Sequence, residues 1–554
     1  MPNHQNNLAN KVAVWLPLLL AGVLALGLYI GLQLNNPVGG QVLQNDEQNG
    51  LYLNGTKGRV DEMMHFIEAK YVDEEDPEIL VRKALRAIIG ELDPHSNYIP
   101  VEDLQAINDQ LDGDFDGIGV EFMVLDDTIV VVSPLSGGPS EAVGIRAGDK
   151  IIRIEDSIVA GVNLSSQDIF SLLRGPKGTE VEIGIKRAGQ QNLLSFTITR
   201  AKIPMHSVDV AIMLDEKTGY IKINRFSATT YDEFVMALER LVEKHKMEDI
   251  VVDLRHNPGG YLKETTRMLS QVFPQQGKLL VYTEGRTVKR TEYKSNGRPF
   301  YPIGEVIVLI DEGSASASEI FAGAVQDHDR GVIIGRRSFG KGLVQEQYPL
   351  RDGSALRLTV ARYYTPSGRC IQKPYGHGED YSGDLEERYH NGELSEEDKM
   401  AIPDSTRFYT DNGYVVYGGG GIMPDIFIPL DTTVLQEEYL IWRQYTSGFV
   451  FRYAEQHQNP FKNYDLDRFV STYTVSNNLY QSYLDYTREQ GVEQDFPQTP
   501  AVIKELKRFL KARLARQYFK DEGFFKVWNQ DDAMVQKALE VLREDDPIAA
   551  ARKE

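Results

Sequence analysis

Cysteine is almost absent from this sequence: Cys370 is the only one in 554 residues, so no intramolecular disulfide can form. No cluster of cysteine and histidine residues has the spacing of a metal site. We therefore expect neither a metal nor an organic cofactor. The patterns G-x-x-x-x-G-K-S/T and G-x-G-x-x-G are missing as well, which argues against nucleotide binding. Cys370 lies in YTPSGRCIQ without a placed histidine, and we expect it to be a small packed side chain rather than a reactive thiol.

Basic residues are fewer than acidic ones. The chain has 60 Lys and Arg against 81 Asp and Glu, a formal net charge of -21. A nucleic-acid partner is therefore not expected, because phosphate binding needs clustered Lys and Arg. The hydrophobic fraction of 42% is ordinary for a globular protein, and the length corresponds to three or four domains.

Long apolar runs are rare, with one exception near the N-terminus. Residues 12–32 (VAVWLPLLLAGVLALGLYIGL) are 21 residues without a charge, about the length that spans a bilayer core. We expect a transmembrane anchor over residues 1–33, with a cleaved signal segment as the alternative. Lys11 precedes the run and Asp46 follows it, so the weak positive-inside bias places the rest of the chain outside the cytoplasm. Residues 34–50 indicate a flexible linker.

The spacing of the apolar residues changes along the chain, and this change predicts a multidomain α+β protein. Helical spacing predicts a helical N-terminal domain over residues 51–110, and short runs between Gly, Pro and Asp predict a β-rich domain over residues 111–204. Strands then alternate with amphipathic helices, which predicts an α/β core over residues 205–434. Within it, the polar stretch near residues 376–400 is expected to be an exposed insertion. Residues 435–554 predict a helical C-terminal extension.

Three serines alternate with alanines in DEGSASASEIFAGAVQDH, directly after an apolar run: Ser314, Ser316 and Ser318. One interpretation is structural, because Ser316 and Glu319 have the spacing of a capping box that begins a helix. The other is catalytic: a serine at a strand-to-helix turn can be a nucleophile, and helix N-terminal N–H groups can stabilise an oxyanion. The choice depends on whether the chain supplies a base.

Two residues are candidates for that base. His328 would complete a Ser-His-Asp triad with an acid such as Asp253, but it lies twelve residues from Ser316 on the same predicted helix, about 18 Å away at ~1.5 Å per residue. Lys341, in RRSFGKGLVQ, follows the next apolar run, and the returning chain can bring it to the serine turn. Lys341 must lose its proton to act as a base, and an exposed loop charge is the alternative interpretation.

A third stretch, DLRHNPGGYL, is a predicted strand that runs into Asn-Pro-Gly-Gly. Its glycines, Gly259 and Gly260, allow backbone N–H groups to point at one small anion, as an oxyanion hole requires.

These three stretches together resemble the carboxyl-terminal processing (tail-specific) serine proteases, whose site is a Ser-Lys dyad with an assisting Gln. The resemblance implies that Ser316 is the nucleophile, Lys341 the general base and Gln345 the residue that orients the lysine. It also implies an oxyanion hole formed by the N–H groups of Ala317 and of either Gly259 or Gly260.

The order of the domains resembles the same family over about residues 51–430. LDPHSNYIP, from Leu92, is similar to its N-terminal helical element, and residues 117–204 are similar to its PDZ domain. The resemblance assigns the carboxylate-binding loop of that domain to Gly117, Ile118, Gly119 and Val120, with the bound peptide added as a strand. Arg174 is similar to an arginine that links the PDZ domain to the protease site in some relatives.

The resemblance therefore predicts an endopeptidase that recognises polypeptide C-termini. From this resemblance together with the apolar run near the N-terminus, we expect a protein anchored by one helix in a bacterial inner membrane, with its domains in the periplasm. Two alternatives stay open: a catalytically inactive PDZ scaffold at the membrane, and a Ser-His-Asp protease with a PDZ domain. An adaptor protein and further copies of the chain in a homo-oligomer are additional candidate partners.

Overall fold

A computed structural model describes residues 58–552, except residues 136, 377–379, 401–403, 433, 435, 458 and 498. The anchor expected over residues 1–33 and the linker over residues 34–50 lie outside the described residues. In the described part of the chain, every helix is too short or too polar to cross a lipid bilayer. Contacts between residues divide the chain into two compact units, and the second begins at Arg82 and continues to the C-terminus.

The N-terminal part begins with two helices but does not end as a separate helical domain. Helix α2 spans Gly58–Lys70 and α3 spans Pro77–Gly90. LDPHSNYIP, expected to be helical, forms a turn and then the short strand β1 (Asn97–Ile99). Both hydrophobic residues of β1 are buried because the strand pairs antiparallel with β18 (Ala355–Tyr364), far along the chain. The last element of this part is α4 (Val101–Asp112).

A β-rich module follows, with its strands in one sheet of order β3-β4-β5-β7-β8 and β6 beside β5. Strand β3 therefore lies at an edge of this sheet. The core is made of branched aliphatic side chains such as Ile129, Ile151 and Ile183, and α6 contributes Ile169. The ribbon of β2 and β9 lies where the chain enters and leaves the module. The elements are β2 (Asp114–Gly117), β3 (Val120–Leu125), β4 (Thr128–Pro134), α5 (Pro139–Ala142), β5 (Lys150–Ile154), β6 (Ser157–Ile158), α6 (Ser166–Leu173), β7 (Glu180–Lys186), β8 (Leu194–Thr199) and β9 (Ala201–Pro204).

The α/β core is built on a six-stranded sheet of order β10-β11-β12-β15-β16-β21. Strands β10 and β11 pair antiparallel, and the other neighbours are parallel. The central strands read as continuous apolar runs, IVV and VIVLI, because both faces of a parallel sheet are covered. The elements are β10 (Val208–Met213), β11 (Thr218–Ile223), α7 (Thr230–Glu239), the π-helix η1 (Arg240–Lys244), β12 (Asp249–Asp253), α8 (Leu262–Val272), β15 (Val306–Ile310), α9 (Ala317–Asp327), β16 (Val332–Gly335) and β21 (Ile426–Phe427).

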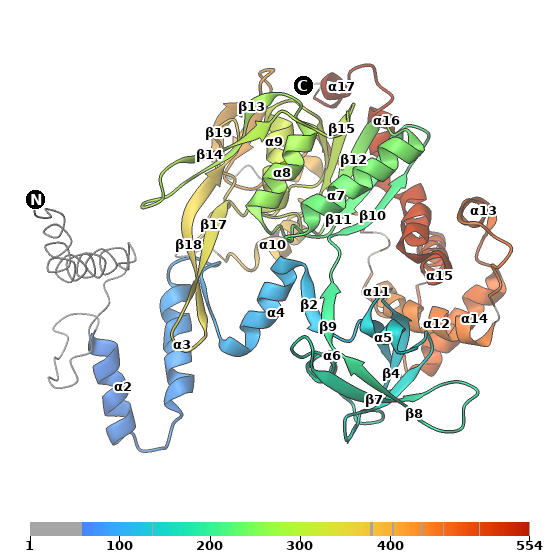
Figure 1. The fold of residues 1–554 in the computed structure, drawn as a ribbon. Coiled ribbons are helices and arrows are strands. Elements are labelled where there is room, and N and C mark those ends of the chain that lie inside the picture. The colour runs from blue at the N-terminus through green and yellow to red at the C-terminus, as the bar shows by residue number, and fades with distance from the viewer. Residues whose placement is uncertain are drawn as a thin grey trace, which may run out of the picture. The chain divides into compact units, whose positions relative to one another are not determined.

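Different helices cover the two faces of this sheet (Figure 1). Helices α7, α8 and α9 pack on one face, where Val252 and Val308 point. Val251 and Ile307 point to the other face, which is covered by the apolar side of α16 (Ala533–Val541), near the end of the chain. The sequence predicts that the core ends at residue 434. The packing of the core extends further, because α16 covers one face of the central sheet.

A second sheet of five strands lies beside the core, in the order β1-β18-β13-β14 with β17 also paired to β18. Strands β17 and β18 form a hairpin whose turn contains Asp352 and Gly353. A register shift between Val344 and Gln345 marks a bulge in β17. The remaining elements of this sheet are β13 (Gln276–Glu284), β14 (Thr291–Asn296) and β17 (Leu343–Pro349).

The insertion near residues 376–400 is less exposed than its composition predicts. It contains α10 (Asp384–His390), and two of its charged side chains, Arg388 and Glu393, are buried. Glu393 pairs with Arg388 at 2.8 Å and with the buried Arg337 of the core at 2.7 Å. Charges at these positions are tolerated inside because each has a partner. The 3-10 helix η2 (Glu397–Lys399) and the hairpin of β19 (Asp404–Tyr409) and β20 (Val415–Gly418) follow.

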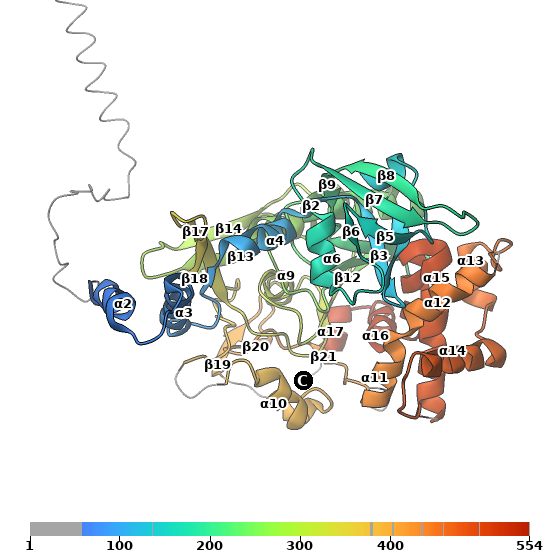
Figure 2. The ribbon, with the colours of Figure 1, turned by 90° about the horizontal axis from the view of Figure 1, so that it is seen from below.

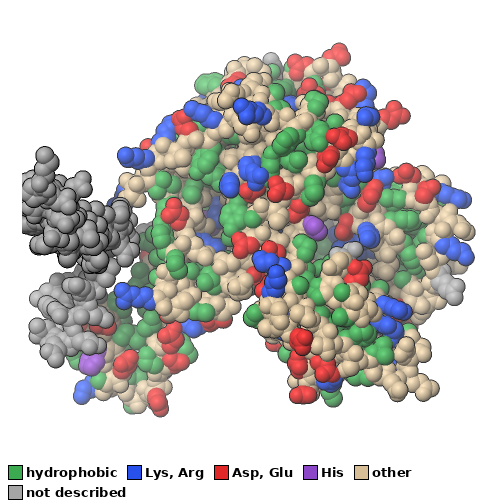
Figure 3. Space-filling model, viewed as in Figure 1, with side chains coloured by type: hydrophobic (Ala, Val, Ile, Leu, Met, Phe, Trp, Pro, Cys, Tyr) green, Lys and Arg blue, Asp and Glu red, His purple; other side chains and the backbone are tan. Residues whose placement is uncertain are grey.

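The C-terminal region is helical, as expected, and has its own aromatic-rich core around Trp442 and Tyr483. It lies beside the β-rich module in both ribbon views (Figure 2), and Arg452 pairs with Asp126 of that module at 3.1 Å. On the face shown in Figure 3, Lys and Arg side chains are interspersed with Asp and Glu. The elements are α11 (Glu437–Gln444), α12 (Thr446–Gln456), α13 (Leu466–Thr472), α14 (Asn477–Glu489), α15 (Pro500–Trp528), η3 (Asn529–Asp531), α16 and α17 (Pro547–Ala551).

Candidate active site

Ser316 lies between the end of β15 and the start of α9, in a strained backbone conformation. Its φ of 54° and ψ of -111° are unusual for a residue with a side chain. Ser314 holds the turn: its hydroxyl accepts from Asp311 N at 2.9 Å and donates to Leu254 O at 2.9 Å. Ser318 donates to Asn257 O at 2.9 Å, so it joins the start of α9 to the loop after β12. The three alternating serines therefore have different roles, and two of them are structural.

The capping contact expected from Ser316 and Glu319 is present, and it uses the backbone of Ser316. The Glu319 carboxylate accepts from Ser316 N at 2.7 Å, and it also accepts from Ser338 Oγ, Gly340 N and Lys341 N at 2.6, 2.7 and 2.9 Å. Burial raises the pKa of this carboxyl to about 7, although the hydrogen bonds oppose the shift. Glu319 thus connects the serine turn to the loop that carries the candidate base.

The glycine loop after β12 lies against the serine turn. A Cβ atom on Gly259 would be 2.8 Å from Ser316 Cβ and 2.9 Å from Ala317 N, so only glycine allows this approach. The N–H of Gly259 donates to Asn257 Oδ1 at 2.9 Å. Among the described residues, the N–H groups of Gly260 and Ala317 have no such partner. Of the two glycines expected to contribute to an oxyanion hole, Gly260 is the one whose N–H is free.

Lys341 lies on the glycine-flanked loop that follows β16. Its ammonium donates to Gln345 Oε1 at 3.1 Å. Burial lowers the pKa of the Lys341 amine, and the charge of Arg357 lowers it further, against the effect of Glu319. The Tyr363 hydroxyl lies within hydrogen-bonding distance of two backbone carbonyls, that of Ser316 at 3.1 Å and that of Lys341. Lys341 is therefore a partly buried amine next to the serine turn, and not an exposed loop charge.

Gln345 is held by residues that the sequence motifs did not indicate. Its amide Nε2 donates to the backbone carbonyl of His95, in the turn before β1. The ring of His95 is 2.7 Å from the hydroxyl of Tyr381, which belongs to the insertion. Burial lowers the pKa of His95 to about 4, with a contribution from the charge of Lys341, so the ring is neutral at pH 7. In the sequence, the only sign of these contacts is the presence of a histidine in LDPHS and of a tyrosine in GEDYSG.

Asp93 fixes this turn. Its carboxylate accepts from the backbone N–H groups of His95 and Ser96, each at 2.9 Å, and from Ser96 Oγ at 2.6 Å. Thr359 of β18 donates its hydroxyl to the same carboxylate at 3.0 Å. Thr359 pairs with Gln345 where β17 and β18 meet. The turn before β1, which Thr359 contacts, therefore lies beside the bulge of β17.

The candidate catalytic side chains line one cleft of about 630 Å³. Its lining includes Ser316, Lys341, Gln345 and both glycines of the loop. Helix α4 contributes Asn108 and Leu111 to its wall. The apolar part of the lining is formed by Leu262, Tyr293, Ile320, Leu343 and Val344. The cleft combines a hydroxyl, a partly buried amine and free N–H groups next to an apolar surface.

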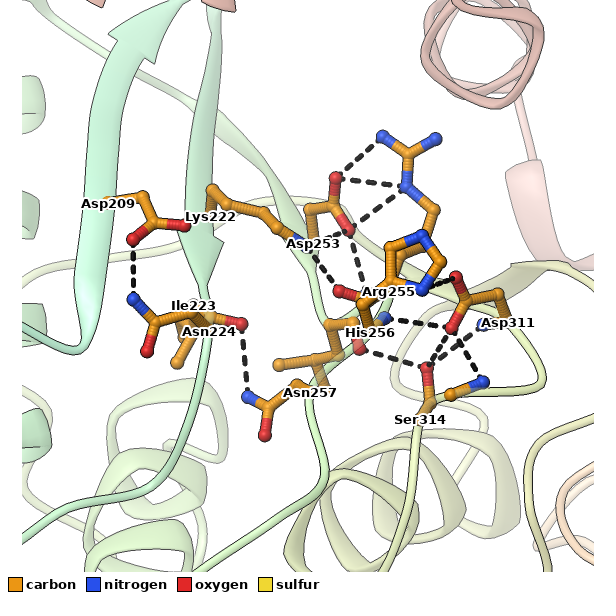
Figure 4. A network of polar contacts seen from close by, with 12 residues as sticks. Asp209, Lys222, Ile223, Asn224, Asp253, Arg255, His256, Asn257, Asp311 and Ser314 are labelled. Atoms are coloured by element: carbon orange, nitrogen blue, oxygen red, sulfur yellow. Dashed lines mark hydrogen bonds and ion pairs between the residues drawn. The ribbon is translucent and has the colours of Figure 1, made fainter. Parts of the chain in front are cut away.

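A buried ionic network holds the residues that come directly before the two glycines (Figure 4). Asp253, at the end of β12, accepts from Tyr220 at 2.6 Å and pairs with Arg255 at 2.6 Å and Lys222 at 3.1 Å. Although burial opposes it, the charge of Arg255 lowers the pKa of Asp253. Arg255 also pairs with Asp532, the N-cap of α16, at 2.8 Å. Asp253 is therefore used structurally and is not free to form a triad.

The loop is joined to the serine turn through Asp311. Its carboxylate accepts from His256 N at 2.8 Å and from Gly313 N at 3.0 Å, and His256 Nδ1 lies 3.1 Å from its second oxygen (Figure 4). His256 has a φ of 58°, so the loop, like the serine turn, holds a strained residue.

His328 is occupied elsewhere. Its Nδ1 lies 2.9 Å from Asp411 Oδ2, and its Nε2 lies 2.6 Å from Leu279 O. Both ring nitrogens thus have partners outside the cleft, which agrees with the distance expected along α9. Cys370 is partly buried, and burial raises the pKa of its thiol, as expected for a packed cysteine.

In the β-rich module, the expected carboxylate loop lies just before the edge strand β3. Gly117 ends β2, Gly119 has a φ of 71°, and Val120 begins β3. The carbonyl of Ile118 accepts from the N–H and the hydroxyl of Ser140, at 3.1 and 2.6 Å, so the loop is fixed from one side.

Arg174 follows α6, and its guanidinium lies 4.5 Å from the ring centre of Phe115 and 3.7 Å from Asp109 of α4. It contacts the helix that walls the cleft rather than the cleft itself.

Comparisons with known proteins agree with this architecture. The model of peptidase family S41 matches residues 217–382, a PDZ domain model matches residues 117–198, and a family of unknown function, DUF8443, matches residues 438–521. The carboxy-terminal processing protease CtpB of Bacillus subtilis is 35% identical over 319 residues, which are 57% of this chain and 65% of CtpB. The carboxy-terminal-processing protease of Bartonella bacilliformis is 36% identical over 341 residues, 60% of this chain and 75% of the relative.

A solved structure, the photosystem II D1 C-terminal processing protease, is 29% identical over 57% of this chain and 84% of its own, with a TM-score of 0.34. The fold, the cleft and the family matches define an α/β peptidase core that follows a PDZ domain along the chain. The chain belongs to the carboxy-terminal processing proteases of peptidase family S41.

Proposed function

We propose that this chain is a serine endopeptidase that cleaves polypeptides by a Ser-Lys dyad. The observation that carries the proposal is the assembly of Ser316, Lys341, Gln345 and Gly260 around one cleft, with free N–H groups on Gly260 and on Ala317 next to the serine. The strained turn brings the Ser316 side chain to the N-terminus of α9, where the helix dipole favours a developing negative charge.

The proposed reaction is acyl transfer. Neutral Lys341 takes the proton of the Ser316 hydroxyl as the oxygen attacks the scissile carbonyl. The oxyanion of the tetrahedral intermediate accepts from the N–H groups of Gly260 and Ala317. Lys341 then gives the proton to the leaving amine, and water hydrolyses the acyl-enzyme with Lys341 again as base. Burial and Arg357 favour this chemistry because they lower the pKa of Lys341.

We propose that substrates are recognised through their C-termini by the PDZ domain. Strand β3 lies at the edge of its sheet and can pair with an added strand. The Gly117–Val120 loop before it offers backbone N–H groups for a terminal carboxylate. The apolar lining of the cleft favours apolar side chains next to the scissile bond.

The two alternatives are less well supported. An inactive scaffold would not need the dyad, the assisting amide and the oxyanion donors together in one cleft. A Ser-His-Asp protease would need a histidine at the serine, and both nitrogens of His328 are bound elsewhere.

We also propose a periplasmic location, with residues 1–33 as the single anchor in a bacterial inner membrane. The uncharged run of residues 12–32 supports it. External protease should degrade the chain in spheroplasts but not in intact cells. Protection in both would contradict this location.

The proposed chemistry is tested with the purified full-length chain and an unstructured protein that has a free apolar C-terminus. We expect Ser316→Ala and Lys341→Ala each to lower kcat/KM at least about a thousandfold. His328→Ala is the matched control and should keep cleavage of the folded fraction. Equal cleavage by Lys341→Ala would require another base and would end the dyad proposal.

A further inference from the structure

Arg357 is a cation of the cleft that has no carboxylate partner among the described residues. It lies on β18 and lines the cleft together with Ser316 and Lys341. Its Nη2 donates to Gln347 Oε1 at 3.0 Å. Among the residues that the structure describes, no carboxylate oxygen lies within 4.0 Å of its guanidinium. A guanidinium has five N–H donors, so most of those of Arg357 remain available to a ligand.

Three buried arginines of the core are each neutralised by a carboxylate at 2.7 Å: Arg336 by Glu312, Arg337 by Glu393 and Arg369 by Asp327. Arg357 is partly buried but has only a neutral amide. Burial without a counter-charge is unfavourable, and here it lowers the pKa of the guanidinium. An anion that enters the cleft would remove this cost.

The charge of the cleft lining is opposite to that of the chain. The whole chain has a net charge of -21. The cleft is lined by three basic side chains, Lys263, Lys341 and Arg357, and by one acidic side chain, Glu346. The carboxylate of Glu346 already accepts from the Tyr348 hydroxyl at 2.6 Å. An anionic group of a substrate therefore meets a locally basic surface next to the nucleophile.

We propose that Arg357 binds a carboxylate of the substrate inside the active-site cleft and so selects which peptide bonds are cut. The carboxylate is either the C-terminal one of a short substrate tail or the side chain of an Asp or Glu near the scissile bond. A guanidinium binds either source through two parallel hydrogen bonds. The inference rests on the proposed function, because it concerns the substrate of the same cleft.

Neighbouring residues hold Arg357 for this role. Gln347, which accepts from its guanidinium, donates through Nε2 to Asn108 of α4 at 3.3 Å. The arginine is thus held between the β17–β18 hairpin and the helix that walls the cleft. A lysine at this position would keep the charge but lose the planar two-point contact.

The test uses three peptides with the same apolar scissile site and the full chain. The first peptide has a free C-terminal carboxylate. The second, the neutral reference, is amidated and carries Asn or Gln beyond the scissile bond. The third is amidated and carries Asp or Glu at that position. The measured quantity is kcat/KM for each carboxylate peptide divided by that for the neutral peptide. This ratio does not depend on the fraction of a variant that folds.

We expect the wild-type ratio to be about tenfold or more for at least one carboxylate peptide. Which peptide gives it identifies the source of the carboxylate. Arg357→Gln should reduce the ratio to near one, and Arg357→Lys should keep part of it. Arg362→Gln is the matched control, since it removes one positive charge from the same strand outside the cleft, where Arg362 bonds to Tyr375; its ratio should equal that of wild type.

Two results would overturn the inference while leaving proteolysis intact: a wild-type ratio near one for both carboxylate peptides, or an unchanged ratio in Arg357→Gln. The second would assign the preference to the PDZ domain. Failure of the wild type to cut any of the three peptides or an unstructured protein would overturn the proposed function, and the inference with it.

Discussion

Glu319 is buried at the centre of the site and accepts four hydrogen bonds from the two segments that carry the proposed dyad. Its pKa of about 7 lies above the ordinary value of 4.5. The folded chain therefore holds a proton that the unfolded chain releases between these values. The stabilising contribution is complete below about pH 4.5 and is lost as pH rises through about 7.

We expect this loss to be on the order of 3 kcal/mol of the free energy of unfolding. Urea unfolding of the wild type and of Glu319→Gln at pH 5 and pH 8 measures it, because the variant has no titrating group there. The stability of the wild type relative to the variant should fall between the two pH values. Glu312→Gln is the control. Burial raises the pKa of Glu312, but hydrogen bonds and the charge of Arg336 lower it below its ordinary value. This carboxyl is therefore ionised in the folded chain at both pH values, and the relative stability should stay nearly constant. A relative stability that is the same at pH 5 and pH 8 would mean that Glu319 is ionised throughout.

Gly260 is a residue whose lack of a side chain has a direct consequence. A Cβ there would lie 2.1 Å from Phe226 O, and the φ is 143°. Gly260→Ala should displace the loop and lower kcat about a hundredfold or more, with a smaller effect on KM, because an oxyanion donor moves. Gly277→Ala is the control: its φ is also positive, 80°, but nothing lies within 4 Å of the added Cβ. Equal kcat in both variants would place the oxyanion elsewhere.

At the scale of elements, the insertion and the turn before β1 together orient Gln345. Tyr381→Phe removes the hydroxyl that contacts His95 but keeps the ring packed near Phe339. We expect kcat to fall about two- to tenfold with KM unchanged, because the backbone carbonyl of His95 loses one restraint. Tyr389→Phe, at an exposed tyrosine of the same insertion, should have no effect. A change in KM alone would indicate that the insertion acts on substrate access.

The sequence allowed some of these elements to be predicted and not others. Alternation and continuous apolar runs indicated the strands and helices of the core, and the three motifs pointed to segments that the structure brings to one cleft. Strand β1 was missed because three residues are too short for a periodic pattern. The contact of Gln345 with His95 joins residues 250 positions apart, and no local signal carries such a pairing. The choice of Gly260 over Gly259 depends on the Asn257 side chain, which only the fold positions.

At the scale of the whole molecule, the end of the chain completes the core. The composition of residues 435–554 suggested an extension, but α16 covers one face of the central sheet with Met534, Val535, Ala538 and Val541. Amphipathic spacing predicts that α16 has an apolar side, but it does not say which distant surface that side covers.

This arrangement predicts a sharp difference between two sides of α16. Val535 is fully buried, whereas Lys537 pairs with Glu540 near the surface. Val535→Asp should leave little folded protein, because it buries an unpaired charge, and Lys537→Asp should cost at most about 1 kcal/mol. Urea unfolding and the yield of protein resistant to trypsin measure the effect. Similar stability of both variants would mean that the core does not need α16.

The ion pair between Arg255 and Asp532 joins residues 277 positions apart. At about 5–20 residues per second, a ribosome needs roughly 15 to 55 s to make the intervening chain. During this time Arg255 lacks one of its two acidic partners, and one face of the sheet is not covered. We expect the nascent chain to stay inactive until α16 has left the ribosome and packs on the sheet, so that the protease does not act before its core is complete.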